Sequence, residues 1–275
     1  MLVFPNCKIN IGLHILTKRA DGFHNLETVF YPVPLKDALE IIHTKDQSTT
    51  VFSASGIEVQ GKSEDNICLK AYRLLKKDFS QLPAVQIHLH KAIPVGAGLG
   101  GGSSDAAFTL SLLNTKFQLG LSQEQLIEYA LQLGSDCPFF IKNEPCFASG
   151  RGEIFEPVSV SLAGYYLLLV NPGIHINTGW AFTELSKIKN ELPAGNLKAV
   201  VELPVENWKD AVTNHFEAAI VTHYPVIAAI KDQLYNAGAV YTAMSGSGST
   251  LYGLFKKEPS SISFPEHYFT HIALL

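Results

Sequence analysis

The chain has few charged residues, no long apolar segment and no run of basic residues. Charged residues make up 17% of its 275 residues, and the formal net charge is -4. This composition indicates neither a nucleic-acid surface nor an anionic-membrane surface. The longest strongly apolar run, residues 165–170, is too short to span a bilayer. Asn6, Lys8 and Asn10 interrupt the apolar N-terminal stretch, so we expect no signal peptide there.

Cysteine is also scarce, and its spacing is uninformative for metal binding. The four cysteines, Cys7, Cys68, Cys137 and Cys146, show no C-x-x-C pattern. Such spacing predicts free thiols in a reducing compartment rather than disulfides or a zinc site. We therefore expect a cytoplasmic protein.

Strand-like and helix-like stretches intermix along the chain without regular alternation. Hydrophobic residues reach 47%, enough for a large core in one or two domains. Period-2 alternation and β-branched residues predict strands at 3–16 (one or two), 26–33, 39–42, 50–53, 85–91, 165–170, 240–244 and 251–255. Helix patterns and caps predict helices from Asp65 or Asn66 to about 77, and at 106–113, 122–134, 178–189, 214–221 and 225–236. This order favours an α+β fold, and we place a boundary near 156, giving domains 1–156 and 157–275.

The most distinctive stretch is a glycine-rich loop that holds five of the 21 glycines between Gly96 and Gly102. A predicted strand, 85–91, precedes it, and a predicted helix follows with Ser103, Ser104 or Asp105 as its cap. Glycines allow positive φ and close approach of the backbone, and a helix N-terminus presents unpaired N–H groups. The order strand, glycine loop and helix start therefore predicts a phosphate-binding site, to which serine hydroxyls would add donors or a metal ligand.

A second glycine stretch, residues 56–63, matches the P-loop pattern G-x-x-x-x-G-K-[ST]. We reject it as a phosphate site. Ile57 and Val59 alternate with polar residues as in a strand, and Glu64 and Asp65 would repel phosphate.

The spacing Gly96-x-Gly98-x-x-Gly101 also matches the dinucleotide fingerprint. That motif needs an acidic residue about 20 positions further on, and residues 117–121 provide none. We therefore interpret the loop as a phosphate site of a different kind.

Single polar residues leave alternatives open. Alternation places Lys8 on one face with Asn6 and Asn10, where it is either an exposed strand lysine or a functional group. Asp136 follows a helix-ending glycine and precedes an apolar run, so it is either a turn residue or an acid buried for a purpose. His24 lies in a predicted turn, where a histidine is more often structural than functional.

Three segments, residues 5–13, 94–104 and 245–249, together resemble the three motifs of the GHMP small-molecule kinases in order and spacing. The resemblance implies a two-domain α+β fold. Its N-terminal domain would be like the second domain of ribosomal protein S5, and its C-terminal domain would be ferredoxin-like. Residues 134–140 and 171–178 also fit the family, so the resemblance covers most of the chain.

Residues 19–26 resemble one branch of this family, which acts in the non-mevalonate route to isoprenoid precursors. The implied reaction transfers the γ-phosphoryl group of ATP to the tertiary 2-hydroxyl of a methylerythritol unit joined to cytidine diphosphate. No protein partner is implied. One alternative is a family member that acts on homoserine, mevalonate or a sugar, but the segment 21–24 argues for a substrate with a base to stack. The other is a non-catalytic nucleotide-binding regulator, against which the presence of Lys8 and Asp136 argues.

The resemblance also implies which residues catalyse the transfer and which hold ATP and its metal. Asp136 would take the proton of the attacking hydroxyl, and Lys8 would lower the pKa of that hydroxyl and stabilise Asp136 as an anion. Mg²⁺ would neutralise the phosphate oxygens, with Ser104 as a candidate ligand. The ATP loop would comprise Pro94, Val95, Gly96, Ala97, Gly98, Leu99, Gly100, Gly101, Gly102, Ser103 and Ser104.

For the second substrate, the resemblance implies that Asn10 binds the erythritol end and that Phe23 stacks on cytosine. His24 would bind the edge of the base. Phe182 would face Phe23 across the base, and Thr178 would lie nearby.

The chain departs from the common family pattern at three positions. Phe23 stands where Tyr is common, which keeps a stacking face without the hydroxyl. Asp105 stands where Asn is common, and it either faces away from the phosphates or helps to hold the metal. Cys7 replaces a common Ala.

Overall fold

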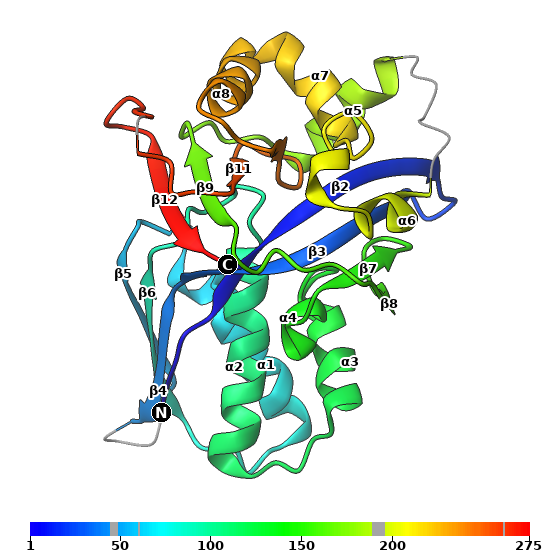
Figure 1. Ribbon diagram of the computed structural model, residues 1–275. Helices are drawn as coiled ribbons and strands as arrows, with labels where there is room; N and C mark the ends of the chain where they lie inside the picture. The colour runs from blue at the N-terminus through cyan, green and yellow to red at the C-terminus, as the bar shows by residue number, and fades with distance from the viewer. Residues whose placement is uncertain (45–48, 60, 189–195, 261) are drawn as a thin grey trace. The chain divides into compact units, whose positions relative to one another are not determined.

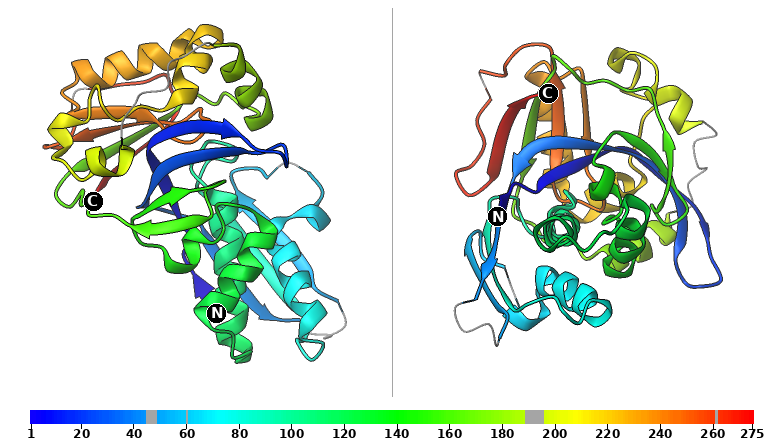
Figure 2. Two further views of the ribbon diagram at one scale, coloured as in Figure 1. Left: turned by 90° about the vertical axis from the view of Figure 1, so that its right-hand side faces the viewer. Right: turned by 90° about the horizontal axis from the view of Figure 1, so that it is seen from below.

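The computed structural model describes residues 1–44, 49–59, 61–188, 196–260 and 262–275. It divides into two compact units, and the chain passes between them several times (Figures 1 and 2). Unit 1 comprises Met1–Cys7, Leu35–Val95 and Gly100–Glu144, and unit 2 comprises Lys8–Pro34, Gly96–Leu99 and Pro145–Leu275. The boundary near residue 156 stays a prediction.

Unit 1 is a four-stranded sheet packed against helices. Its strand order is β1 (Leu2–Val3), β4 (Ala38–His43), β6 (Val85–Lys91) and β5 (Val51–Gly56), with only the β5–β6 pair parallel. The helices are α1 (Ile67–Asp78), α2 (Gly101–Phe117), α3 (Gln123–Leu133) and the short α4 (Phe139–Lys142), with a 3₁₀ turn at Ser63–Asp65. One apolar core joins the sheet to the helices: Ile41, Ile87 and Leu89 of the sheet pack in the same cluster as Leu75 of α1 and Leu110 of α2.

Local sequence signals account for several element boundaries in unit 1. Asn66, rather than Asp65, caps α1 by accepting a hydrogen bond from the Cys68 N–H at 2.9 Å. Ser122 and Gln125 form a capping box at the start of α3, which ends before Gly134. Strand β6 alternates buried and more exposed residues, as the sequence predicted.

The prediction of a strand through Ile57 and Val59 is wrong, because β5 ends at Gly56. Gly56 adopts φ +80°, and the next N–H, of Ile57, donates to the Lys91 carbonyl at 2.8 Å. A Cβ at Gly56 would lie 2.2 Å from that same carbonyl oxygen. This glycine is therefore used for packing against backbone. Position 60 of the stretch lies outside the described residues.

Unit 2 contains two sheets and several helices. One sheet has the order β2 (Asn6–Lys18), β3 (His24–Lys36), β7 (Cys146–Ser149) and β8 (Ile154–Pro157). The other is fully antiparallel, in the order β10 (Tyr241–Met244), β11 (Leu251–Phe255), β9 (Tyr166–Asn171) and β12 (Phe269–Leu274). The helices are α5 (Thr178–Lys187), α6 (Leu197–Val201), α7 (His215–His223) and α8 (Pro225–Asn236), with a 3₁₀ turn at Val205–Asn207. The last residue predicted for the helix at 178–189 lies outside the described residues.

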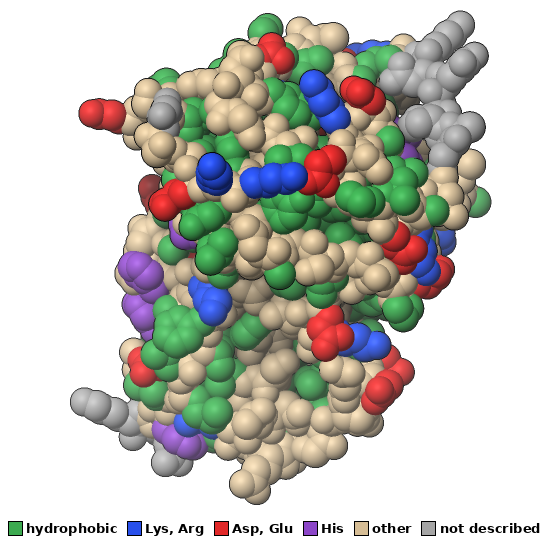
Figure 3. Space-filling model, in the orientation of Figure 1, with side chains coloured by type: hydrophobic (Ala, Val, Ile, Leu, Met, Phe, Trp, Pro, Cys, Tyr) green, Lys and Arg blue, Asp and Glu red, His purple; other side chains and the backbone are tan. Residues whose placement is uncertain are grey.

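The surface carries charges of both signs. On the face that Figure 3 shows, lysine and arginine side chains stand beside aspartate and glutamate and do not gather into a patch. No helix in the described parts of the chain has the length and apolarity that crossing a bilayer requires.

Strand β2 is joined to the start of α7 by a buried pair of histidines in unit 2. The rings of His14 and His215 stack with centroids 4.6 Å apart and an interplanar angle of 13°. The Ile15 N–H donates to Nδ1 of His215 at 3.0 Å, and the Leu13 N–H donates to the Thr213 carbonyl at 2.9 Å. Both rings are buried, and Nε2 of His215 finds no partner among the described residues. The pair therefore packs best as two neutral imidazoles.

We expect this pair to make the protein less stable in mild acid. Burial, and after it the neighbouring His215, lowers the pKa of His14 from 6.5 to about 4. Because the folded-state pKa lies below the ordinary value, the stabilisation is complete above 6.5 and is lost as the pH falls toward 4. His14→Phe keeps an aromatic ring but cannot be protonated, so its melting temperature should fall less between about pH 7 and pH 5 than that of the wild type. Equal pH dependence of the two proteins would contradict this role of His14.

Candidate functional site

The glycine-rich loop leads into α2 through three residues of left-handed backbone. Gly96, Gly98 and Gly100 have φ of +65°, +79° and +70°. Gly100 is the N-cap of α2, and no side chain caps the helix. The prediction that Ser103, Ser104 or Asp105 caps it is wrong, because the helix begins earlier, at Gly101. The N–H groups of the first turn are thus left for another acceptor.

The glycines of this loop serve different purposes. A Cβ at Gly98 would lie 2.0 Å from the Ser245 carbonyl oxygen, so Gly98 lets two glycine loops pack together. A Cβ at Gly101 would lie 2.9 Å from the Ile93 side chain. Gly102 is exposed, and a Cβ there would meet nothing within 4 Å. Open space beside an uncapped helix start is what an incoming phosphate needs.

The other glycine loop, residues 245–249, connects β10 to β11 as predicted. Asn214 holds it by donating from Nδ2 to the carbonyls of Met244 and Gly246, at 2.7 and 2.8 Å. The Ser245 hydroxyl donates to the Gly98 carbonyl at 2.9 Å. Sequence reasoning missed Asn214, whose only local signal was its suitability as the cap of α7.

Lys8 is buried, so it is not the exposed strand lysine that the sequence allowed, while its catalytic role stays a prediction. Its side chain is 3% exposed, and Nζ donates to Asn10 Oδ1 at 2.5 Å and to the Gly98 carbonyl at 3.2 Å. The ammonium also lies 5.0 Å from the centroid of the Phe30 ring. Asn10 in turn donates to Thr28 Oγ1 at 2.9 Å, so its amide is already engaged within unit 2. Substrate binding by Asn10 stays a prediction.

Asp136 lies in unit 1, in the turn between α3 and α4, and is half-buried. The next residue, Cys137, is fully buried and hydrogen-bonded to the Ser103 side chain. Burial raises the pKa of the Cys137 thiol to about 12, and the bond from Ser103 opposes this rise. Through this contact the turn that carries Asp136 is held against the first turn of α2.

The residues predicted to bind the base lie in unit 2. Phe182 was expected to face Phe23, but its ring contacts His24. The Phe182 ring stacks on His24, with centroids 4.5 Å apart and an interplanar angle of 8°. It also packs edge-on against Phe216, which fixes its direction. Phe23 is 54% exposed, and the Arg151 guanidinium lies 5.0 Å from its ring centroid.

Two further features belong to this part of unit 2. The Thr178 hydroxyl, at the start of α5, lies 2.9 Å from the Ser247 hydroxyl in the glycine loop at residues 245–249. Burial, and after it the charge of Lys18, lowers the pKa of His24. The imidazole is therefore neutral near pH 7, with one donor and one acceptor nitrogen. Arg151 was missed by sequence reasoning.

A buried group of charges lies behind the start of α2 in unit 1. Lys91 Nζ is 2.5 Å from Asp37 Oδ2 and 2.8 Å from Asp105 Oδ2, and all three side chains are almost fully buried. Burial raises the pKa of Asp105 to about 7, although the Lys91 charge lowers it. Asp105 therefore faces the interior. Asp105 Oδ1 and the Ser104 hydroxyl have no hydrogen-bond partner among the described residues.

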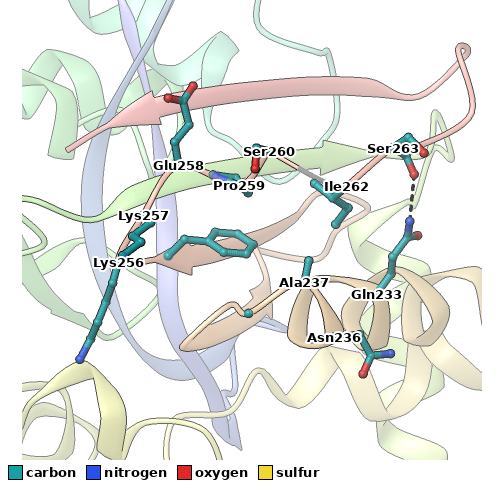
Figure 4. A pocket seen from close by; sticks show the side chains of 12 residues that line it. Gln233, Asn236, Ala237, Lys256, Lys257, Glu258, Pro259, Ser260, Ile262 and Ser263 are labelled. Atoms are coloured by element: carbon teal, nitrogen blue, oxygen red, sulfur yellow. Dashed lines mark hydrogen bonds between the residues drawn. The ribbon is translucent and has the colours of Figure 1, made fainter.

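A separate cavity of about 600 Å³ lies in unit 2, between the end of α8 and the segment after β11 (Figure 4). Across it the Gln233 amide donates to the Ser263 carbonyl at 2.9 Å. None of the functional residues predicted from the sequence lines this cavity.

The chain matches known proteins over nearly all of its length. The GHMP kinases N terminal domain matches residues 66–144, and the GHMP kinases C terminal domain matches residues 189–264. A 4-diphosphocytidyl-2-C-methyl-D-erythritol kinase of Bacteroides fragilis is 55% identical over 259 residues, which cover 94% of this chain and 93% of the relative. A protein of the same name from Cytophaga hutchinsonii is 47% identical over 262 residues, covering 95% and 94%.

Solved structures agree on the fold. The crystal structure of a 4-(cytidine 5'-diphospho)-2C-methyl-D-erythritol kinase superposes with a TM-score of 0.77 at 28% identity, covering 92% of this chain and 90% of that one. The Methanococcus jannaschii mevalonate kinase gives 0.71 at 14% identity, covering 94% and 92%, which supports the fold alone. The predicted two-domain α+β kinase fold is thus confirmed, and the chain belongs to the 4-diphosphocytidyl-2-C-methyl-D-erythritol kinase family of GHMP kinases.

Proposed function

We propose that the chain transfers the γ-phosphoryl group of ATP to the 2-hydroxyl of 4-diphosphocytidyl-2-C-methyl-D-erythritol, in the non-mevalonate route to isoprenoid precursors. The observation that carries this proposal is the uncapped start of α2, which follows a left-handed glycine loop and has open space at Gly102. Relatives of 44–55% identity bear the name of this kinase. None of the four cysteines forms a disulfide in the described part of the chain, which supports the cytoplasmic location that the sequence predicts.

The triphosphate would be held by the loop of residues 94–104. Phosphoryl transfer depends mainly on positioning and on stabilising charge that spreads over the phosphate oxygens. Backbone N–H groups at Gly101, Gly102 and Ser103 supply fixed donors together with the positive end of the α2 dipole.

Asp136 would accept the proton of the attacking hydroxyl, and the turn that holds it is tied to α2 through Cys137 and Ser103. Lys8 would favour the deprotonated hydroxyl through its positive charge. Its ammonium is held in place by Asn10 and by the Gly98 carbonyl.

Mg²⁺ would accompany the nucleotide. The described residues contain no group of three His, Cys, Asp or Glu side chains that could hold a metal. The Ser104 hydroxyl is a buried oxygen without a hydrogen-bond partner among the described residues, which fits the role of a single ligand. When bound, the ion would neutralise negative charge on the phosphate oxygens.

The cytidine end would be recognised by Phe23 and His24. The exposed Phe23 ring offers a face for stacking. The stacked pair of His24 and Phe182 holds a neutral imidazole whose edge can donate to or accept from the base. Thr178 would add a hydroxyl, and Asn10 would bind the erythritol end.

The role of Asp136 is tested by Asp136→Asn, which keeps the shape of the side chain and removes the base. The rate constant kcat should fall about 10²–10⁴-fold, whereas ATP affinity should stay close to that of the wild type. Steady-state kinetics and direct ATP titration on the folded variant measure both. A variant with normal kcat would show that another group takes the proton.

The phosphate site is tested at Gly102, because the two expected effects have opposite signs. Gly102→Asp removes a helical glycine and places a carboxylate at the positive end of α2, so the protein should be stabilised by about 0.5–1 kcal/mol. The same carboxylate would occupy the place of a phosphate, and KM for ATP should rise at least about tenfold. Gly102→Asn, the neutral control, should raise KM less. If Gly102→Asp leaves KM for ATP unchanged, the triphosphate binds elsewhere.

Base recognition is tested with cytidine and uridine forms of the substrate. Phe23→Ala should raise KM for the cytidine form by roughly one to two orders of magnitude, because stacking contributes about 1–3 kcal/mol. Phe23→Tyr should be nearly neutral, since its ring face is the same. The wild type should use the uridine form poorly. His24→Ala should narrow the difference in kcat/KM between the cytidine and uridine forms. Equal use of both forms by the wild type would exclude recognition of the base.

A further inference from the structure

The two ends of the glycine loop are joined inside unit 1 by one buried ammonium. Lys91 is the last residue of β6, just before the loop, and Asp105 lies in α2, just after it. The Lys91 ammonium bonds Asp105 Oδ2 at 2.8 Å and Asp37 Oδ2 at 2.5 Å. Since Asp37 lies between β3 and β4, this one cation connects three separate parts of the unit.

Asp37 also fixes the direction in which the loop leaves β6. Its other carboxylate oxygen, Oδ1, accepts from the N–H groups of Ala92 and Ile93 at 2.7 and 2.9 Å. These are the first two residues after Lys91. The same carboxylate therefore binds both the lysine and the backbone that begins the loop.

The position of Lys91 points to an indirect role toward phosphate. Its Nζ lies 3.3 Å from where a Cβ of Gly101 would be, so the cation sits behind the first residue of α2. Its side chain is 3% exposed, and two carboxylates surround it. Charge on Lys91 is thus neutralised within the protein rather than presented to a ligand.

We propose that Lys91, together with Asp37 and Asp105, is a positioning group that fixes the two ends of the glycine loop relative to each other. It thereby orients the uncapped N–H groups of α2 for the triphosphate. This inference rests on the function proposed above, and it concerns residues to which that function assigns no role.

The test must remove the tether without leaving two buried carboxylates face to face, as Lys91→Met alone would. The variant is therefore Lys91→Met combined with Asp105→Asn, in which Asp37 keeps its bonds to Ala92 and Ile93. Asp105→Asn alone is the matched control, because its amide oxygen still accepts from Lys91. Leu82→Ala is a second control: it weakens the same core, where Leu82 is 1% exposed, without touching the tether.

The first measurement is amide hydrogen exchange in the protein without nucleotide. The Ser104 amide, which donates to the Gly100 carbonyl at 2.9 Å, should exchange about tenfold faster or more in the double variant than in either control. Exchange no faster than in Leu82→Ala would overturn the proposal, since the charges would then contribute stability alone.

The second measurement is kinetic. In the double variant KM for ATP should rise about tenfold or more, with a smaller change in KM for the second substrate, whereas both controls should stay close to the wild type. Faster exchange with an unchanged KM for ATP would overturn the positioning role. A wild type that shows no ATP-dependent turnover would refute the proposed function, yet the exchange result would still decide whether the tether orders the loop.

Discussion

The Gly98 carbonyl is the point on which the polar interior of unit 2 depends. It accepts hydrogen bonds from Lys8 and from the Ser245 hydroxyl, at 3.2 and 2.9 Å. These bonds bring the two glycine loops into contact. Such close packing requires glycine at position 98, because a Cβ there would stand 2.0 Å from the Ser245 carbonyl oxygen. The absence of a side chain at one position thus allows a lysine to be buried with its bonds satisfied.

The start of α2 shows the opposite arrangement, in which polar groups are left unpaired. No side chain caps the helix, although Ser103 and Ser104 lie within its first turn. Ser103 bonds Cys137 instead, and the Ser104 hydroxyl has no partner among the described residues. Unpaired polar groups of this kind reduce stability, and proteins retain them chiefly where a bound ligand supplies the missing hydrogen-bond partner.

Each unit contains a buried lysine next to its own part of the glycine loop, and the two ammonium groups are stabilised in different ways. Lys8 is bonded to neutral oxygens of Asn10 and Gly98 and lies over the Phe30 ring. Lys91 is paired with two carboxylates. Buried ion pairs contribute little net stability, because desolvation offsets the attraction, so their main effect is to specify one geometry.

Local chemistry made much of the fold predictable. Interactions between residues close in sequence account for the caps Asn66 and Ser122 and for the alternation in β6. They also account for the glycine loops, one of which connects β10 to β11 in a hairpin. The family motifs identified Lys8 and Asp136 in the same way, since motif residues are read by type and spacing. These features required no knowledge of the tertiary structure.

The tertiary structure decided what depends on residues far apart in the chain. Lys91 meets Asp37 across 54 residues, and the Phe182 ring stacks on His24 and packs edge-on against Phe216. Even the cap of α2 could not be read locally, because Gly100 begins the helix with a left-handed backbone that leaves three suitable side chains inside it. The sequence by itself indicated most of the elements, their order and the loop that would bind phosphate, but it gave no prediction for β7, β8, β12, α4 or α6. Which polar groups are paired, buried or left open was decided only when packing placed distant side chains together, because burial and long-range hydrogen bonds have no local sequence signature.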